Sequence, residues 1–399
     1  MQENFIMKML GIKEKHVELW DMKEENREFH FWLQTKQRKQ SCPKCGEKTK
    51  RVHSYRTQLI KGRLIEERPV KIHLRKRRYL CTSCHHTFYE KLAFVKRYQR
   101  HTASLEQQVL TYVGEHSFKA AGKMAGVSTN HVLRIFNKRS INVNRILPEV
   151  IAIDEFKGDA DKQKFQTIIV DVQNKKIIDV LPDRLSKTIE NYFRNCDTSG
   201  VKIVVMDLSK RFKEAVRRAL GDPLIIADRF HYMRQAYWAF DKVRREVQNE
   251  LHKEDRVLCK RNKELLWKSP TKLTEEQRKR VRGLLEDKPK LEEAYVLKNK
   301  LDEWFKRSNC YTARTGLEDW FALVENSNIE ELKTVVQTFK RWKTEILNSF
   351  IYPSYSNGYI EGVNNTTKVI KRTSYGIKSF ERLRKKILWR QNVREVSVY

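Results

Sequence analysis

The first hundred residues contain short segments in which apolar and polar residues alternate, as they do in strands with one buried face. The segments His16–Met22 and Glu28–Leu33 alternate in this way on either side of Glu24–Asn26, which predicts a hairpin. Further along, Val70–Arg75 places Val, Ile and Leu on one side and Lys, His and Arg on the other. This region therefore predicts a small β module in which one strand has a basic face.

From residue 104 to residue 140 the apolar positions follow the period of an α-helix. Within this region Phe118–Arg134 reads FKAAGKMAGVSTNHVLR, with Gly126 available for a turn at positive φ and Ser128 as an N-cap. The pattern is typical of a helix-turn-helix, and an ordinary helical hairpin is the alternative. In the first interpretation the residues that face a DNA major groove are Thr129, Asn130, His131 and Arg134.

Around Val150 the pattern changes to short, nearly continuous apolar runs, which are typical of central strands in a covered sheet. The five runs are Val150–Ile153, Thr167–Val170, Ile177–Leu181, Val201–Met206 and Leu224–Ala227. The first three favour a meander, and helices are expected near Ser186–Arg194 and Lys210–Leu220. The chain then reads as mostly helical from about Gln235 to Asn348, and a final basic helix is expected to start near Tyr359.

The charge of the chain indicates the class of its partner. Its 399 residues include 82 Lys and Arg against 50 Asp and Glu, a formal net charge of +32. Lys36–Leu80 contains 16 basic and 3 acidic residues, and Lys368–Arg390 contains 9 and one. This excess favours nucleic acid as the partner. An anionic membrane is disfavoured because we find no lipidation motif, signal peptide or long apolar stretch, and the expected location is the cytoplasm.

Four of the seven cysteines form two closely spaced pairs, too few in total for a disulfide scaffold. Cys42 and Cys45 lie in CPKCG, and Cys81 and Cys84 lie in CTSC. In a reducing compartment two CxxC pairs predict a structural Zn²⁺ site with four thiolate ligands. The alternative is two unrelated reduced pairs. The neighbouring His85 and His86 are candidate spare ligands, but with four cysteines available they read as polar surface residues.

Three carboxylates occupy positions suited to metal-dependent chemistry. Asp154 and Asp207 directly follow two of the apolar runs, and Glu361 opens the expected final helix. Carboxylates at neighbouring strand ends, together with one from a nearby helix, can hold two Mg²⁺ ions that act on a phosphodiester. Asp171 and Asp179 occupy similar positions, and an Asp at a strand end more often caps a turn.

The expected final helix also carries residues suited to a DNA strand. Glu361, Asn364 or Asn365, Lys368 and Arg372 recur at helical spacing, so one face runs from a metal ligand to phosphate-binding cations. A solvated helix face is the alternative interpretation of the same spacing.

At this point the chain resembles, over nearly its whole length, the bacterial insertion-sequence transposases of the ISL-three (ISL3) family. The similarity rests on the two cysteine knuckles, the AGVS turn, and the segments Ile153–Gly158, Ala227–His231, Ser356–Asn365, Lys371-Arg372 and Tyr375-Gly376. The resemblance implies a ribonuclease H-like core with an Asp-Asp-Glu triad, which falls on Asp154, Asp207 and Glu361. It also implies a helical insertion before Glu361, and a D-x-x-H element, Asp228 with His231, that supports the active site.

The resulting expectation is a multidomain α+β protein with an N-terminal zinc-binding β module, a helix-turn-helix, and a ribonuclease H-like α/β core interrupted by a helical insertion. The expected segments are the zinc module at 1–100, the helix-turn-helix at 101–147, the two parts of the core at 148–236 and 331–399, and the insertion at 237–330. The expected DNA-contacting residues are Arg75, Lys76, Thr129, Asn130, His131, Arg134, Asn364, Lys368, Lys371 and Arg372.

These features together predict a DDE transposase that binds the inverted-repeat ends of an insertion sequence and cuts and joins DNA with Mg²⁺ or Mn²⁺. The expected partners are the double-stranded DNA of the element ends and target, and further copies of the chain, at least a dimer on DNA. The expected setting is the bacterial cytoplasm, at the nucleoid when DNA is bound. Two alternatives stay open: a non-catalytic zinc and helix-turn-helix regulator, and a nuclease of the same fold that cuts without joining.

Overall fold

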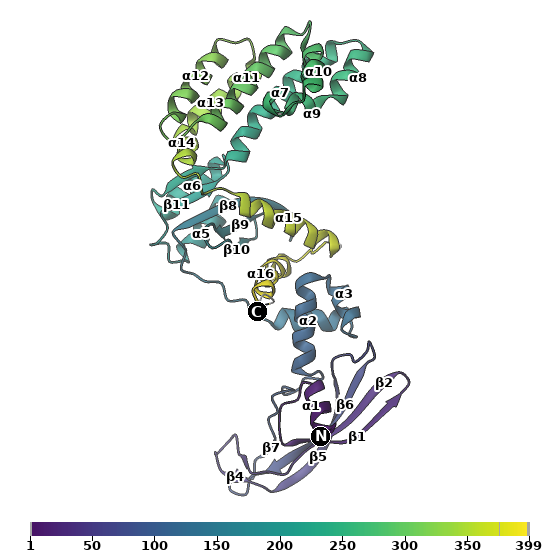
Figure 1. Ribbon diagram of the computed structural model, residues 1–399. Helices are drawn as coiled ribbons and strands as arrows, with labels where there is room; N and C mark the ends of the chain where they lie inside the picture. Colours follow the sequence, from purple (N-terminus) through teal and green to yellow (C-terminus); the bar gives the residue numbers. More distant parts are fainter. Residues whose placement is uncertain (1, 375, 397–399) are drawn as a thin grey trace. The chain divides into compact units, whose positions relative to one another are not determined.

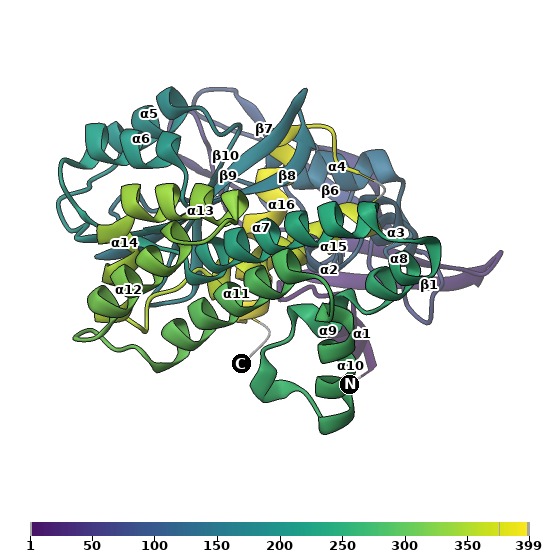
Figure 2. The same ribbon diagram turned by 90° about the horizontal axis from the view of Figure 1, so that it is seen from above.

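The structure is a computed structural model that describes residues 2–374 and 376–396, so Tyr375 of the family pattern lies outside the described residues. The chain forms two compact units. The first unit comprises Met1–Asn142 and Thr367–Tyr399, and the second comprises Val143–Thr366 (Figures 1 and 2). In the described part of the chain, no helix has the length and apolar character needed to cross a membrane.

A five-stranded sheet forms the N-terminal part of the first unit. Its order is β1-β2-β6-β5, with β7 also pairing with β6. The bounds are β1 Val17–Glu25, β2 Glu28–Thr35, β5 Val52–Lys61, β6 Val70–Leu80 and β7 Thr87–Tyr89. The expected hairpin is confirmed, because β1 and β2 pair antiparallel around Asn26 and Arg27, which both have positive φ. A short helix, α1 (Gln2–Met9), precedes the sheet and was not expected.

The alternation along β6 places its apolar side chains inside, as expected. Ile72 and Leu74 are fully buried and pack with Leu33 and Ile60. Lys76 follows the same alternation inward and is also buried, whereas Arg75 lies on the other face and is half-buried. The two-residue period of the strand turns Lys76 toward the interior, a side less suited to a phosphate than that of Arg75, and the DNA contact expected at Lys76 stays a prediction.

Three short helices follow the sheet within the first unit: α2 (Ala103–Glu115), α3 (Phe118–Met124) and α4 (Thr129–Lys138). The turn between α3 and α4 contains Gly126 at φ +65°, and the hydroxyl of Ser128 accepts a hydrogen bond from His131 N at 3.3 Å. Buried side chains from α2 and α4, including Val109, Val132 and Phe136, hold the helices together. The turn and N-cap read from the sequence are therefore present.

The basic C-terminal region forms two helices, so the expectation of one final helix was wrong. The first is α15 (Gly358–Thr373), and the second is α16 (Phe380–Val396). Helix α16 packs on α2, where Trp389 Nε1 donates to the carbonyl oxygen of Leu110 at 2.8 Å. Lys386 Nζ donates to the carbonyl oxygen of His116 at 2.7 Å, so this lysine supports the helix-turn-helix from within the first unit.

A second five-stranded sheet, with order β10-β9-β8-β11-β12, forms the centre of the second unit. The bounds are β8 Val150–Ala160, β9 Gln163–Asp171, β10 Lys176–Leu181, β11 Ile203–Met206 and β12 Leu224–Ala227. The expected meander is confirmed, since β8, β9 and β10 pair antiparallel, while β11 pairs parallel with both β8 and β12. Helices α5 (Ser186–Arg194) and α6 (Lys210–Leu220) share an apolar core with the sheet.

Between the last strand of this sheet and α15, the second unit is a helical bundle, coloured from teal to yellow-green in Figure 1. Its helices are α7 Arg229–Glu250, α8 Lys253–Arg261, α9 Lys263–Trp267, α10 Glu275–Leu285, α11 Pro289–Arg307, α12 Ala313–Glu325, α13 Glu330–Arg341 and α14 Lys343–Ile351. One apolar core includes Phe240, Trp320, Phe339 and Ile346, so α13 and α14 belong to the same bundle as α7. This core extends beyond residue 330, where we expected the insertion to end; the five-segment division itself stays a prediction.

Candidate functional site

The four cysteines of the two CxxC pairs converge in the first unit. Cys42 Sγ lies 3.6 Å from Cys84 Sγ, and Cys45 Sγ lies 3.5 Å from Cys81 Sγ. All four sulfur atoms lie within 4.8 Å of one another, which fits four ligands around one Zn²⁺ ion.

The surroundings act differently on the thiols of this cluster. A backbone hydrogen bond from Glu47 favours the Cys45 thiolate, but side-chain hydrogen bonds with Cys84 and Cys81 outweigh it and raise the pKa of Cys45 to about 12. Hydrogen bonds from the backbone N–H groups of Cys84 and Ser83 lower the pKa of Cys81 to about 7, against the opposing effect of burial. A lowered pKa makes the metal-binding thiolate form more available. His85 and His86 are exposed, as expected for surface residues.

Fewer of the four expected DNA-facing residues of helix α4 are exposed than the sequence indicated. Asn130 and Arg134 are exposed and lie one helical turn apart, so they share one face. Thr129 is half-buried, and the ring of His131 packs edge-on against His101 at 4.8 Å. The side chain of His131 therefore faces the interior of its own unit, which leaves Asn130 and Arg134 as the outward pair.

Three aspartates of the second unit lie side by side at one edge of the sheet. The parallel strands β8, β11 and β12 are aligned so that Ile153, Met206 and Ala227 stand at one level. The next residue of each strand segment is Asp154, Asp207 or Asp228. Because successive residues of aligned parallel strands stay level, the pairing register brings the three carboxylates to the same edge.

One detail of this arrangement differs from the sequence-based expectation. Asp154 does not follow a strand, because β8 continues to Ala160 and Asp154 pairs with Ile168 of β9. What ends at Ile153 is the pairing of β8 with β11. Asp154 thus stands where the parallel part of the sheet stops, which is why it still lies beside Asp207.

His231 joins two of the three carboxylates. Its Nδ1 lies 2.6 Å from Asp207 Oδ1 and 2.7 Å from Asp228 Oδ2. Asp228 is the N-cap of α7, and its carboxylate also accepts a hydrogen bond from His231 N at 3.3 Å. The D-x-x-H pattern is therefore a capped helix start that holds the imidazole between two acids.

Two asparagines from the segment before and within α15 complete the cluster. Asn364 Nδ2 donates to Asp154 Oδ2 at 2.8 Å. Asn357 Nδ2 lies 3.5 Å from Asp207 Oδ1, and Asn357 N donates to Asp228 Oδ1 at 3.3 Å. Asn364 is buried in this contact, so its position suits support of Asp154 rather than the DNA contact expected for it.

The charges of the cluster shift its pKa values. Burial, reinforced by the negative charge of Asp207, raises the pKa of Asp154 to about 7. Burial also raises the pKa of Asp207, although its hydrogen bond with His231 opposes this. Burial lowers the pKa of His231, but its hydrogen bonds to Asp207 and Asp228 outweigh this effect and raise the pKa to about 9. The imidazole is therefore protonated at neutral pH and partly offsets the carboxylates.

The donor set fits a hard divalent cation. Crowded carboxylates with raised pKa values gain from a nearby positive charge, and oxygen ligands suit Mg²⁺ or Mn²⁺. Among the residues that the structure describes, none donates a hydrogen bond to the buried Oδ1 atoms of Asn357 and Asn364. These amide oxygens supply acceptor capacity that a cation or its bound water can use.

Glu361 is close to Asn357 and Asn364 in sequence but does not belong to the group of close ligand atoms in this cluster. It lies on α15 between Asn357 and Asn364, four residues after the first and three before the second. Its side chain is exposed, and the described ligand atoms that lie within 4.8 Å of one another belong to Asp207, Asp228 and His231. Lys368 and Arg372 are exposed and Lys371 is half-buried along the later turns of α15.

Sequence reasoning gave Asn357 no role and Asp228 only a supporting one. Asp228 follows an apolar run in the same way as Asp207, so the sequence contained the signal for its position. Asp171 and Asp179, the other candidates, make local contacts: Asp171 accepts from Asn174 N at 2.9 Å, and Asp179 from Val180 N at 2.7 Å.

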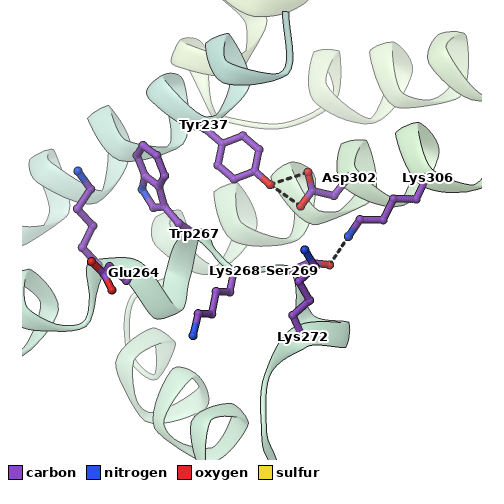
Figure 3. A pocket seen from close by; sticks show the side chains of 9 residues that line it. Tyr237, Glu264, Trp267, Lys268, Ser269, Lys272, Asp302 and Lys306 are labelled. Carbon is purple, nitrogen blue, oxygen red and sulfur yellow. Dashed lines mark hydrogen bonds between the residues drawn. The ribbon is translucent and has the colours of Figure 1, made fainter. Parts of the chain in front are cut away.

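A cavity of about 470 Å³ opens beside the acidic cluster, with Asp207, His231, Lys210 and Trp238 among its lining residues. A larger cavity of about 600 Å³ lies in the bundle among α7, α9 and α11 (Figure 3). There Tyr237 donates to Asp302 at 2.8 Å, and Lys306 donates to Ser269, also at 2.8 Å. Because these contacts are satisfied internally and Asp154 and Asp207 lie elsewhere, the smaller cavity is the better candidate for the reaction site.

Comparisons with known proteins match the chain in three consecutive regions. A family model described as "Transposase" matches residues 151–387. A model described as "zinc-finger of transposase IS204/IS1001/IS1096/IS1165" matches residues 38–84. A model described as "Helix-turn-helix domain of transposase family ISL3" matches residues 90–140. The matched regions contain the acidic cluster, the four cysteines and helix α4, respectively.

Individual relatives agree with these models. The chain is 27% identical over 355 residues to the transposase for insertion sequence element IS1001 of Bordetella parapertussis, covering 85% of this chain and 86% of that protein. It is 22% identical over 258 residues to the transposase for insertion sequence element IS1557 of Mycobacterium tuberculosis, covering 57% of each. A match to a protein named ATP-dependent protease from Lactococcus lactis covers only 15% of this chain and carries no functional argument.

The cysteine geometry predicts about one Zn²⁺ per chain, bound by Cys42, Cys45, Cys81 and Cys84. Cys42→Ser should lose the metal and loosen the N-terminal module, while the second unit, Val143–Thr366, stays folded. Elemental analysis and limited proteolysis measure the two effects. Cys310→Ser, which changes an exposed cysteine outside the cluster, is the control. Purified wild-type protein without stoichiometric zinc would contradict the assignment.

The pKa of Asp154 predicts a pH-dependent loss of stability in metal-free protein. A carboxyl whose folded pKa is raised from 3.8 to about 7 favours the folded state when protonated, so this contribution is lost as pH rises between those values. Without added Mg²⁺ or Mn²⁺, Asp154→Asn should gain thermal stability relative to wild type as the pH rises from 3.8 to about 7, by at most about 1.4 kcal/mol per pH unit, with no further gain above that range. Thermal unfolding at several pH values measures this.

Asp171→Asn is the control, because Asp171 is also buried but accepts a hydrogen bond from Asn174. This variant should follow the wild-type pH profile in the same experiment. If the stability of wild type and of Asp154→Asn changed with pH in the same way, Asp154 would make no pH-dependent contribution to stability, and the prediction would be wrong.

Proposed function

Because this chain belongs to the ISL3 family of transposases, we propose that Asp154, Asp207 and Glu361 are the catalytic triad of its DNA cleavage and joining. The observation that carries the proposal is the strand register that sets Asp154 and Asp207 side by side at the sheet edge. Glu361 enters from α15, on the turn between two asparagines that contact the other two acids. A turn of that helix toward the sheet edge would add its carboxylate to the site.

We assign the sheet and its helices to a ribonuclease H-like core interrupted by the helical bundle. Support comes from the topology, with three antiparallel strands followed by two parallel ones and the acids at the end of the parallel part. The bundle enters directly after Asp228 and ends shortly before Asn357, so it interrupts the core between the second and third members of the triad.

The residues of this site would bind Mg²⁺ or Mn²⁺, which Asp154 and Asp207 suit by their charge and their raised pKa values. The bound ions would activate the attacking oxygen and stabilise the leaving oxygen of an in-line displacement. Asn364 orients Asp154, while His231 and Asn357 orient Asp207. Asp228 holds His231 in place and is a positioning residue.

The reaction proceeds in two displacements at phosphorus. In the first, water attacks the phosphodiester at an element end, and the 3′ oxygen leaves as a 3′-OH. In the second, this 3′-OH attacks a target phosphodiester, so that one P–O bond forms and another breaks. No covalent bond between protein and DNA is required, because the attacking oxygen comes from water in the first step and from the DNA 3′-OH in the second, so no side chain acts as the nucleophile.

Recognition of DNA is assigned to the first unit. We propose that Asn130 and Arg134 of α4 reach base edges in a major groove, while Arg75 on the basic face of β6 and Lys368, Lys371 and Arg372 on α15 meet phosphates. Because the reaction involves both ends of the element, we expect at least two copies of the chain to assemble on the DNA. The setting is the bacterial cytoplasm, at the nucleoid, because that is where the DNA substrate lies.

A DNA-binding regulator without catalytic activity would account for the zinc and helix-turn-helix modules, but it would not need the three aligned aspartates at the sheet edge. A nuclease of the same fold would use them for cutting alone. Joining of a labelled element end to a target duplex distinguishes a transposase from both, and short inverted repeats flanking the reading frame would agree with it.

The proposed triad predicts that Asp154→Ala, Asp207→Ala and Glu361→Ala each abolish cleavage and joining while end binding is retained. Each carboxylate is expected to hold a metal ion rather than DNA, so its loss removes no phosphate contact, and binding should stay equal or improve slightly. Activity should need Mg²⁺ or Mn²⁺, whereas Ca²⁺ should support binding with little chemistry because its coordination is looser. A labelled terminal-repeat substrate measures both steps.

Asp171→Ala and Asp179→Ala are the matched controls and should remain active when folded, since these acids make local turn and strand contacts. A folded Glu361→Ala protein that still cuts and joins would remove α15 from the catalytic assignment.

The recognition proposal predicts different outcomes for two arginines of the first unit. Arg134→Ala should reduce the preference for the element's own ends by roughly 1–3 kcal/mol, as for a lost base contact. Arg75→Ala should weaken binding to all sequences and reduce its salt dependence, as for a lost phosphate contact. Competition between specific and random duplexes at two salt concentrations separates these effects. An unchanged specificity ratio in Arg134→Ala would mean that α4 does not read the bases.

A further inference from the structure

Helix α7 carries a row of aromatic and cationic side chains that the proposed triad does not use. Phe230, Arg234 and Trp238 are spaced four residues apart, so they lie on one face of the helix. The guanidinium carbon of Arg234 lies 5.1 Å from the ring centre of Phe230 and 4.6 Å from that of Trp238. The three side chains form an aromatic–cation–aromatic stack, which we call the α7 ladder.

The ladder is not part of the apolar core of the bundle. Phe230 is 53% exposed and Trp238 is 55% exposed, although both are large apolar side chains. Other aromatic residues of the same helix, Tyr232 and Phe240, are fully buried. Single exposed apolar residues are common, but two of them held in register by a stacked arginine form an ordered apolar and cationic surface.

The ladder also adjoins the acidic cluster. Arg234 and Trp238 line the 470 Å³ cavity together with Asp207 and His231. The ring of Phe230 packs edge-on against that of His231 at 5.6 Å. Lys210 and Arg211, both exposed, line the same cavity. A DNA strand that enters this cavity therefore meets flat rings and positive charges next to the proposed catalytic acids.

From this arrangement we propose that the α7 ladder is a base-stacking site for unpaired nucleotides that flank the scissile phosphate. Exposed aromatic rings bind nucleobases by stacking on their faces, and nearby cations hold the phosphates of the same strand. A base inside a duplex has both faces covered by its neighbours, so the ladder selects nucleotides that have left the helical stack. The ladder would thereby hold the end of the element in a locally opened form.

This proposal rests on the proposed function, since it takes the acidic cluster as the place of strand cleavage. The binding site itself can be tested without any reaction. The test uses full-length, zinc-loaded protein without added Mg²⁺ or Mn²⁺, and two fluorescent probes: a blunt duplex, and the same duplex with short unpaired thymidine arms at one end. Fluorescence anisotropy then gives the preference for the forked probe over the blunt one.

We expect wild-type protein to bind the forked probe more tightly and Trp238→Ala to lose this preference. Removal of one base–aromatic stack corresponds to a loss of about five- to 150-fold on the forked probe. Trp238→Phe should retain most of the preference because a phenyl ring still stacks. Arg234→Ala should reduce the preference because it removes the cation that holds the two rings. Tyr311→Ala, which changes an aromatic residue that is 89% exposed between α11 and α12, should have no effect.

Three results for Trp238→Ala would overturn the proposal. The variant could keep the preference for the forked probe, lose affinity equally for both probes, or change its oligomeric state while its DNA binding stays the same. The second would indicate a general phosphate contact, and the third a contact surface between copies of the chain. Failure of the proposed function looks different, since Asp154→Ala protein would then still cut DNA while the fork preference is unaffected.

Discussion

The alignment of three parallel strands is the constraint on which the second unit depends. The register of β8, β11 and β12 sets Ile153, Met206 and Ala227 at one level, and the next residue along each is an aspartate. Burial at one sheet edge makes these charges costly, as the raised pKa values of Asp154 and Asp207 show. The fold tolerates them because His231, Asn357 and Asn364 each contact one or two of the carboxylates.

The helical bundle is joined to this edge at both of its ends. It starts where Asp228 caps α7, and the chain returns to the cluster at Asn357 soon after α14 ends. The hydrogen bond from Asn357 N to Asp228 Oδ1 links these two points across 129 residues of sequence. Both ends of the bundle are therefore attached at the acidic cluster. Because His231 and the ladder of Phe230, Arg234 and Trp238 lie on the same helix, α7, any movement of that helix displaces them together.

Local patterns predicted much of this architecture. The β1–β2 hairpin and β6 follow from alternation, and the strands of the second sheet from nearly continuous apolar runs, whereas β5 and β7 were not predicted. The α3–α4 turn and the cysteine cluster follow from glycine and cap positions and from ligand spacing. What the sequence could not supply were contacts between distant segments, such as Asn364 with Asp154 or Trp389 with Leu110. Even so, the alternation of β6 already turned Lys76 inward, and Asp228 followed its apolar run just as Asp207 did, so both positions could be read from the sequence.

The central claim is that the aligned acids and Glu361 form one metal site. A crystal structure of the protein with Mn²⁺, analysed by anomalous scattering, tests it most directly. The account predicts Mn²⁺ bound to oxygens of Asp154 and Asp207, with the Glu361 carboxylate drawn in from its exposed position on α15. Mn²⁺ bound instead by Asp207, Asp228 and His231, with Glu361 still exposed, would contradict the triad.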